Sequence, residues 1–124
     1  MRFMCKCIGK LKREKPVVCI DFDGVLNNYK FYDPDNLFDM RPGADDFIMK
    51  LSVIYRVVIL TARDIGKVKE WLQENEITVD EVTNVKPPAV CYVDDRAVRF
   101  DGDFNRALYD VRHFYTFWEL NYDE

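Results

Sequence analysis

The chain alternates short apolar runs with segments in which apolar residues recur every three or four positions. The first apolar run, at 17–20, leads directly into the sequence Asp-Phe-Asp-Gly at 21–24. Two later runs, at 57–60 and 90–93, also end at polar residues. Apolar runs of this length, rich in β-branched residues and bounded by turn residues, are typical of buried strands in parallel sheets. We therefore predict three buried strands, each of which ends in polar side chains.

Two helices are predicted between these strands. The first begins at 42–46 and the second covers 65–75. A short extended piece with a stiff turn follows at 82–88, and the aromatic tail at 104–118 is interpreted as helical. Strands that alternate with helices indicate an α/β fold, a three-layer Rossmann-like arrangement whose mainly parallel sheet is covered on both faces. The apolar faces of the two helices consist of Phe47, Ile48, Leu51 and Ile54 and of Val68, Trp71 and Leu72.

The length and composition indicate one globular domain. At 124 residues the chain is long enough for a hydrophobic core and too short for two domains of ordinary size. None of its apolar runs approaches the roughly 20 residues that span a bilayer, and the N-terminus has no apolar core of a signal peptide. We therefore expect a cytoplasmic protein without a membrane partner.

Charge is distributed unevenly along the chain. Residues 1–15 form a basic arm with six Lys or Arg and one Glu, a net +5. Because the whole chain carries −4, residues 16–124, the predicted core domain, carry −9. Nonspecific binding to nucleic acid depends on the number of phosphates that a protein neutralises, so an acidic body disfavours it. A nucleic-acid partner is therefore allowed but not favoured, and the arm is interpreted as a solvated terminus.

The four cysteines are interpreted as reduced thiols. Cys19 and Cys91 lie inside apolar runs, where buried free thiols are common. Cys5 and Cys7 lack the additional Cys or His residues nearby that a zinc site requires. The cysteines therefore predict neither a disulfide framework nor a zinc site.

Polar side chains stand at the end of each strand-like segment. Because the carboxyl ends of parallel strands meet at one edge of a sheet, we expect these side chains to converge. Neighbouring acids at such an edge repel each other and lose hydration, so they stay ionised only opposite a cation such as Mg²⁺ or several amide donors. Acids around a metal, with a hydroxyl and a lysine, meet the needs of a phosphate monoester. The set consists of Asp21, Asp23, Thr61, Lys86, Asp94 and Asp95.

Four short motifs contain these residues: Asp-Phe-Asp-Gly at 21–24, Leu-Thr-Ala-Arg at 60–63, Lys-Pro at 86–87 and Tyr-Val-Asp-Asp at 92–95. In this order they resemble the motifs of the haloacid dehalogenase-like (HAD) superfamily of phosphohydrolases. The resemblance extends over most of the chain, from residue 17 to residue 102. It implies a Mg²⁺-dependent phosphatase that forms an aspartyl-phosphate.

The resemblance also implies a role for each matching residue. Asp21 would attack phosphorus, and Asp23 would protonate the leaving oxygen and then activate the water that releases phosphate. Metal ligands would come from Asp94 and Asp95, together with Asp21 and the backbone carbonyl of Asp23. The phosphoryl group would be bound by the hydroxyl of Thr61, by backbone amides near Phe22, Asp23 and Ala62, and by Lys86.

Four of these residues have a structural alternative. Thr61 would serve as the cap of the following helix, and Lys86 would be an ordinary surface lysine. Asp95 would pair with a neighbouring arginine instead of the metal. Arg63 stands within reach of a substrate, but an exposed salt bridge is the alternative. His113 and Trp118, in the aromatic tail, are interpreted as packing residues.

The spacing of the motifs leaves no room for a cap domain over the site. A cap could be inserted only in the loop at 27–41 or between Thr61 and Lys86, and the second segment is already used by a helix and a short strand. The site should therefore be open, to be covered by a large substrate, by the loop as a partial lid, or by another subunit. Four aromatic residues of the loop would suit a ring or sugar face, or pack over the sheet: Tyr29, Phe31, Tyr32 and Phe38.

Three functions are consistent with these residues. The first is a phosphatase without a cap domain, whose phosphorylated substrate and oligomeric state the motifs do not define. The second is a nucleic-acid end phosphatase, which the open site favours and the acidic body opposes. The third is a noncatalytic module that binds phosphate or a partner, although such a module has no need of the acid at position 23.

Overall fold

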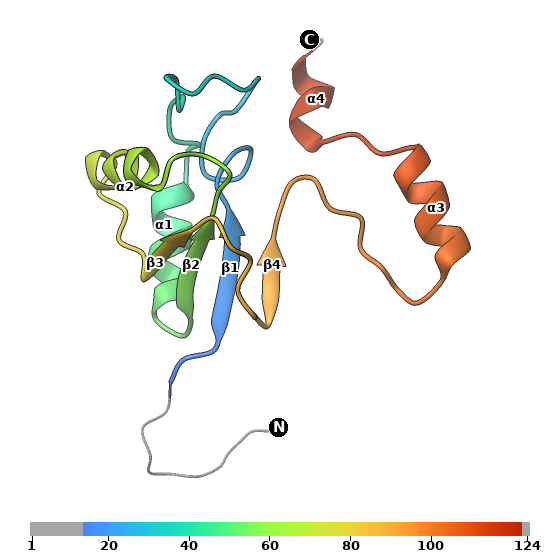
Figure 1. Ribbon diagram of the computed structural model, residues 1–124, viewed down its shortest axis with the longest axis horizontal. Coiled ribbons are helices and arrows are strands. Elements are labelled where there is room, and N and C mark those ends of the chain that lie inside the picture. Colours follow the sequence, from blue (N-terminus) through green and yellow to red (C-terminus); the bar gives the residue numbers. More distant parts are fainter. Residues whose placement is uncertain (1–13, 123–124) are drawn as a thin grey trace.

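The computed structural model describes residues 14–122, which form a four-stranded sheet with helices (Figure 1). The strands are β1 (Val17–Asp21), β2 (Arg56–Leu60), β3 (Glu81–Thr83) and β4 (Cys91–Val93). All neighbours are parallel, in the order β3-β2-β1-β4, so the predicted α/β fold is confirmed. The predicted basic arm, apart from its last two residues, lies outside the described residues.

Helices α1 (Ala44–Ser52) and α2 (Ile65–Glu74) cover one face of the sheet. Alternate residues of β1 and β2 point toward these helices because successive side chains of a strand point to opposite faces. The rings of Trp71 and Phe22 are nearly perpendicular, with a centroid distance of 4.9 Å. The core that results includes Val18, Ile20, Phe22, Ile48, Val57, Ile59, Val68, Trp71 and Leu72.

The first helix differs from its prediction at its end. It follows Gly43, whose φ of 93° is a left-handed conformation that glycine adopts readily. The helix stops at Ser52, so Ile54 lies beyond it and is exposed, as is Phe47 on its outer side. The expectation that both residues face the core is wrong, whereas Ile48 is fully buried.

The second face of the sheet is covered by an extended connection instead of a helix. Residues 84–90 cross from β3 at one edge to β4 at the other (Figure 1). The Tyr92 hydroxyl donates to the Pro87 carbonyl at 2.6 Å, and Cys19, the register partner of Tyr92, is buried. So short a connection has no room for a crossover helix, which explains why this face differs from the expected arrangement.

Strand β4 is an edge strand, so its burial was predicted wrongly. Its residues Cys91 and Tyr92 are exposed, and the Cys91 thiol is free but not buried. The Cys19 thiol is free and buried, as predicted for that residue. The two strands carry similar apolar runs, but β1 lies between two neighbours and β4 has only one.

The aromatic tail, which was interpreted as helical, forms two helices. Helix α3 (Phe104–Arg112) and helix α4 (Phe117–Tyr122) are separated by a break around Thr116. Among the described residues, no other helix or strand packs against α3, and Phe104 is 80% exposed. His113 stacks on Tyr109 at the exposed surface. No helix in the described part of the chain is both long and apolar enough to cross a membrane.

Candidate functional site

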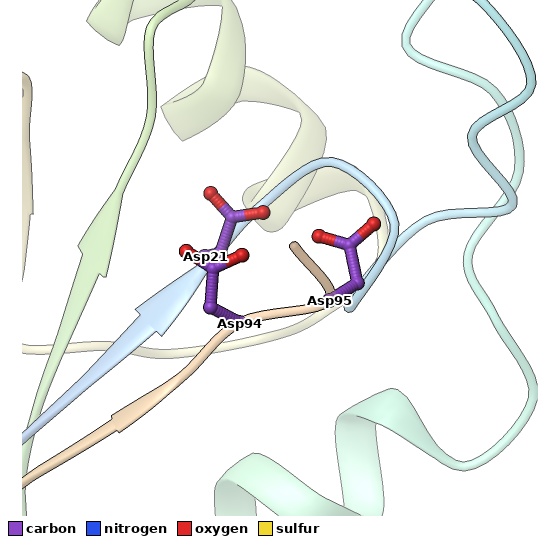
Figure 2. Close-up of side chains that lie close together, drawn as sticks. All are labelled: Asp21, Asp94 and Asp95. Atoms are coloured by element: carbon purple, nitrogen blue, oxygen red, sulfur yellow. The ribbon is translucent and has the colours of Figure 1, made fainter. Parts of the chain in front are cut away.

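Three carboxylates gather at the carboxyl end of the sheet (Figure 2). Asp21 is the last residue of β1, and Asp94 and Asp95 directly follow β4. Because β1 and β4 are parallel neighbours, their ends coincide, and one carboxylate oxygen of each acid lies within 4.8 Å of the others. The predicted convergence of these three acids is therefore seen, and we call them the acidic cluster.

No ion pair links the acidic cluster to a Lys or Arg side chain among the described residues. Burial, followed by repulsion from Asp94 and then Asp95, raises the pKa of Asp21 to about 8. The Oδ1 atom of Asp95 is buried and has no hydrogen-bond partner within residues 14–122. Buried polar atoms without partners are uncommon in folded proteins, and carboxylate oxygens are the ligands that hard cations prefer. The donor set therefore fits a divalent cation such as Mg²⁺.

The side chain of Asp23 lies outside the acidic cluster. Both of its oxygens accept hydrogen bonds from Arg63 Nε, at 2.9 and 3.0 Å, and Oδ1 also accepts one from Asn27 Nδ2 at 2.9 Å. These contacts fix the carboxylate between the end of β1 and the loop at 27–41. The metal ligand expected at this position is the backbone carbonyl of Asp23. The side-chain contacts do not test that role, which stays a prediction.

Arg63 is buried, so the alternative of an exposed salt bridge is wrong. Its side chain is 2% exposed and pairs with Asp23. The remaining guanidinium nitrogens donate to the carbonyls of Asp33 at 2.7 Å and Asn36 at 3.4 Å. Arg63 therefore joins the candidate acid to the loop at 27–41, and its role as a substrate contact remains a prediction.

Thr61 is buried directly after β2, and its hydroxyl accepts a hydrogen bond from the Arg63 amide at 3.0 Å. The cap of α2 is Asp64, whose carboxylate accepts from the Lys67 amide. The alternative in which Thr61 caps this helix is therefore wrong. The hydroxyl hydrogen of Thr61 has no acceptor among the described residues, which leaves it available to an incoming oxygen.

Two of the predicted phosphate-binding amides remain available and one does not. The Phe22 amide donates to the Leu60 carbonyl at 3.2 Å and so belongs to the sheet. The amides of Asp23 and Ala62 donate to no acceptor within the described part of the chain. They stand just after β1 and β2, where an anion at the sheet edge would meet them.

Lys86 does not pair with an acid in the part of the chain that the structure describes. Its ammonium group lies 4.5 Å from the centroid of the Tyr92 ring, on the face that residues 84–90 cover. Its charge lies close enough to influence the Cys19 thiol, whose pKa is raised mainly by burial. Neutralisation of Asp21 by Lys86 therefore stays a prediction.

Two further residues shape the site, and the sequence analysis gave them no such role. Asn27 is buried, and it accepts from the Gly24 amide and donates to Asp23 and to the Leu37 carbonyl. Because Asn27 follows shortly after the first motif, the sequence could have indicated that it belongs to the site. Trp118 donates from Nε1 to Asp95 Oδ2 at 2.5 Å. It comes from a segment without clear periodicity, so no sequence signal placed it here.

Gly24 explains how Asp95 can approach the end of β1. Its φ of 86° favours glycine, and a Cβ at this position would lie 2.0 Å from Asp95 Oδ2. Any side chain here would therefore displace Asp95. The glycine of the first motif is required by the packing of the acidic cluster.

The fold and the acidic cluster define an α/β protein with a candidate metal site at the carboxyl edge of a parallel sheet. Among solved structures, a conserved protein of Bacteroides thetaiotaomicron has the same fold, with a TM-score of 0.58 and 17% sequence identity. The match covers 84% of this chain and 95% of that chain. At this identity the likeness establishes the fold alone. No family model and no curated protein matches the sequence.

Proposed function

We propose that this protein is a Mg²⁺-dependent phosphatase of the HAD type, which hydrolyses phosphate monoesters through an aspartyl-phosphate. The observation that carries the proposal is the acidic cluster at the end of the central strand. Three neighbouring carboxylates that form no ion pair with the described side chains are costly for a fold, so a bound ligand is the simplest reason for them.

The proposed reaction has two steps. Asp21 attacks phosphorus, an O–P bond forms, and the bond to the leaving oxygen breaks while Asp23 supplies the proton that this oxygen takes up. Water then attacks the aspartyl-phosphate, Asp23 accepts a proton from it, and phosphate and free Asp21 result. Arg63 and Asn27 orient Asp23 for both proton transfers through the hydrogen bonds described above.

The substrate would be held by donors around the end of β1 and β2. The amides of Asp23 and Ala62 and the hydroxyl of Thr61 are available to phosphoryl oxygens. A Mg²⁺ ion held by Asp21, Asp94 and Asp95 would neutralise phosphoryl charge. Together these groups would supply part of the up to ~10²¹-fold acceleration that phosphate monoester hydrolysis requires.

The test is phosphate release from 4-nitrophenyl phosphate, with Mg²⁺ and with EDTA, by the native protein and Asp21→Asn. Turnover that depends on Mg²⁺ and is lost in the variant supports the proposal. The matched control is Asp45→Asn, which removes the same charge from the exposed first turn of α1 and should keep native turnover. Folded protein that binds Mg²⁺ but releases no phosphate would contradict the proposal and favour the noncatalytic binding module.

A further inference from the structure

A cavity of about 350 Å³ lies beside the acidic cluster, and we call it the aromatic pocket. It is an open pocket between the loop at 27–41 and α4, which extend beyond the same end of the sheet (Figure 1). Trp118 belongs to both sites, because it lines the cavity and donates its indole hydrogen to Asp95. The walls are formed mainly by Tyr29, Lys30, Phe38, Asp39, Arg41 and Trp118.

Three aromatic rings supply the apolar part of the pocket lining. The Tyr29 ring meets Trp118 edge to face at a centroid distance of 5.5 Å and meets Phe38 at 6.1 Å. Burial, and next the charge of Asp23, raises the pKa of the Tyr29 hydroxyl. Aromatic side chains arranged in this way are common platforms for a planar ring.

The backbone of Phe38 supports a role for its ring in the pocket. Its φ of 61° is left-handed, a conformation that is uncommon for a bulky residue. Two hydrogen bonds hold it there, from the Phe38 amide to Asn36 Oδ1 at 2.9 Å and from Trp71 Nε1 to the Phe38 carbonyl at 2.8 Å. Glycine would adopt this conformation more easily than phenylalanine. The Phe38 ring is therefore present although the backbone conformation disfavours a side chain.

Polar groups in the pocket complement a ring that carries both hydrogen-bond acceptors and donors. Arg41 contributes a buried Nε–H that has no acceptor within residues 14–122, and Lys30 adds a second cation. Asp39 lines the same cavity and offers an acceptor. A ring with acceptors and donors could form hydrogen bonds with Arg41, Lys30 and Asp39 that a plain hydrocarbon ring cannot form.

We propose that the aromatic pocket binds the leaving group of the substrate and selects a planar heteroaromatic ring, as a nucleobase has. This inference rests on the proposed phosphatase function, because the pocket adjoins the place where the phosphoryl group would react. Its volume suits a single small molecule instead of a polymer. The substrate class is then a nucleotide-like phosphate monoester.

The first test compares kcat/KM for AMP and for ribose 5-phosphate in the presence of Mg²⁺. The two compounds share the sugar and the phosphate and differ only in the base. Stacking of one base predicts a preference for AMP of about fivefold to 150-fold. Equal kcat/KM values for the two substrates would overturn the inference while the phosphatase function stands.

Two variants remove rings from the pocket, Tyr29→Leu and Phe38→Gly, and both should reduce the preference for AMP to within about twofold. Phe38→Gly is compatible with the backbone conformation at that position, so the fold should persist. The control Phe47→Leu alters an exposed aromatic residue on α1 outside the pocket and should keep the preference. A preference that survives both pocket variants would contradict the inference.

A binding measurement separates the pocket from the chemistry. Calorimetric titration with adenosine and with ribose needs neither a phosphate nor turnover. Adenosine binding by the native protein, weakened at least about fivefold in both pocket variants, supports the pocket even if no phosphate ester is hydrolysed. Failure of adenosine to bind the native protein at millimolar concentration, or equal binding by ribose, would overturn the pocket whatever the enzyme assay shows.

Discussion

The substitution Asp21→Asn should make the metal-free protein more stable at alkaline pH. Asn has nearly the same shape as Asp but no charge, so the variant removes one member of the acidic cluster. The folded state raises the pKa of Asp21 from 3.8 to about 8, first through burial and then through Asp94 and Asp95. The native fold therefore binds a proton that the unfolded chain has already released between these pH values.

The sign follows from proton linkage. Between about pH 4 and about pH 8 the folded state binds more protons than the unfolded chain. The free energy of unfolding of the native protein therefore falls as the pH rises through this range. A shift of this size would correspond to roughly 6 kcal/mol if the site were closed to water. Because the cluster lies at the sheet edge, in contact with solvent, we expect about 1–3 kcal/mol. For a chain of this length that is about 3–12 °C in Tm.

The assay is thermal and urea unfolding in EDTA at pH 5 and pH 8.5. At pH 8.5 the variant should unfold at the higher temperature, and at pH 5 the same difference should be roughly a third as large. Mg²⁺ should reverse this order by stabilising the native protein more than the variant. Asp45→Asn controls for the lost charge and should show no such pH dependence. A variant less stable than the native protein at pH 8.5 in EDTA would refute the electrostatic reasoning.

Three further predictions concern neighbouring residues. Arg63→Ala should lower the free energy of unfolding by about 3–5 kcal/mol, because it leaves the half-buried Asp23 carboxylate and the Asp33 carbonyl without their donor; a loss below 1 kcal/mol in urea unfolding would contradict this. Gly24→Ala should abolish the Mg²⁺-induced rise in Tm, since its Cβ would displace Asp95; an unchanged rise would show that Asp95 is dispensable for metal binding. Alkylation of the native protein followed by peptide mass spectrometry should modify Cys91 and spare Cys19, which is buried and has a raised pKa; equal modification of both would contradict the described burial.

Much of the fold could be predicted from local patterns. The apolar run of β1 and the helical spacing in α2 both correspond to elements of the structure, and Trp71 is buried as expected. The burial of β4 could not be predicted in the same way. Whether an apolar run becomes a central or an edge strand depends on the order of strands in the sheet, which a local pattern does not encode.

The acidic cluster was predictable because parallel strands place their carboxyl ends together. The position of Arg63 was not, because its burial depends on carbonyl groups of a loop thirty residues earlier in the chain. Trp118 was unpredictable for a similar reason. Its contact with Asp95 is made by a terminal helix whose path is determined by tertiary structure alone.

The acidic cluster joins the most buried strand of the sheet to the least buried one. Asp21 and Asp94 are 73 positions apart in the sequence, and among the strands of the described residues β4 pairs with β1 alone. A cation shared by these acids would act as a cross-link that closes a long loop, so the entropy lost on closure would be coupled to ion binding. Ordering of the β4 edge and occupancy by the ion would then be a single equilibrium, in which the concentration of free Mg²⁺ controls how often the edge of the sheet opens.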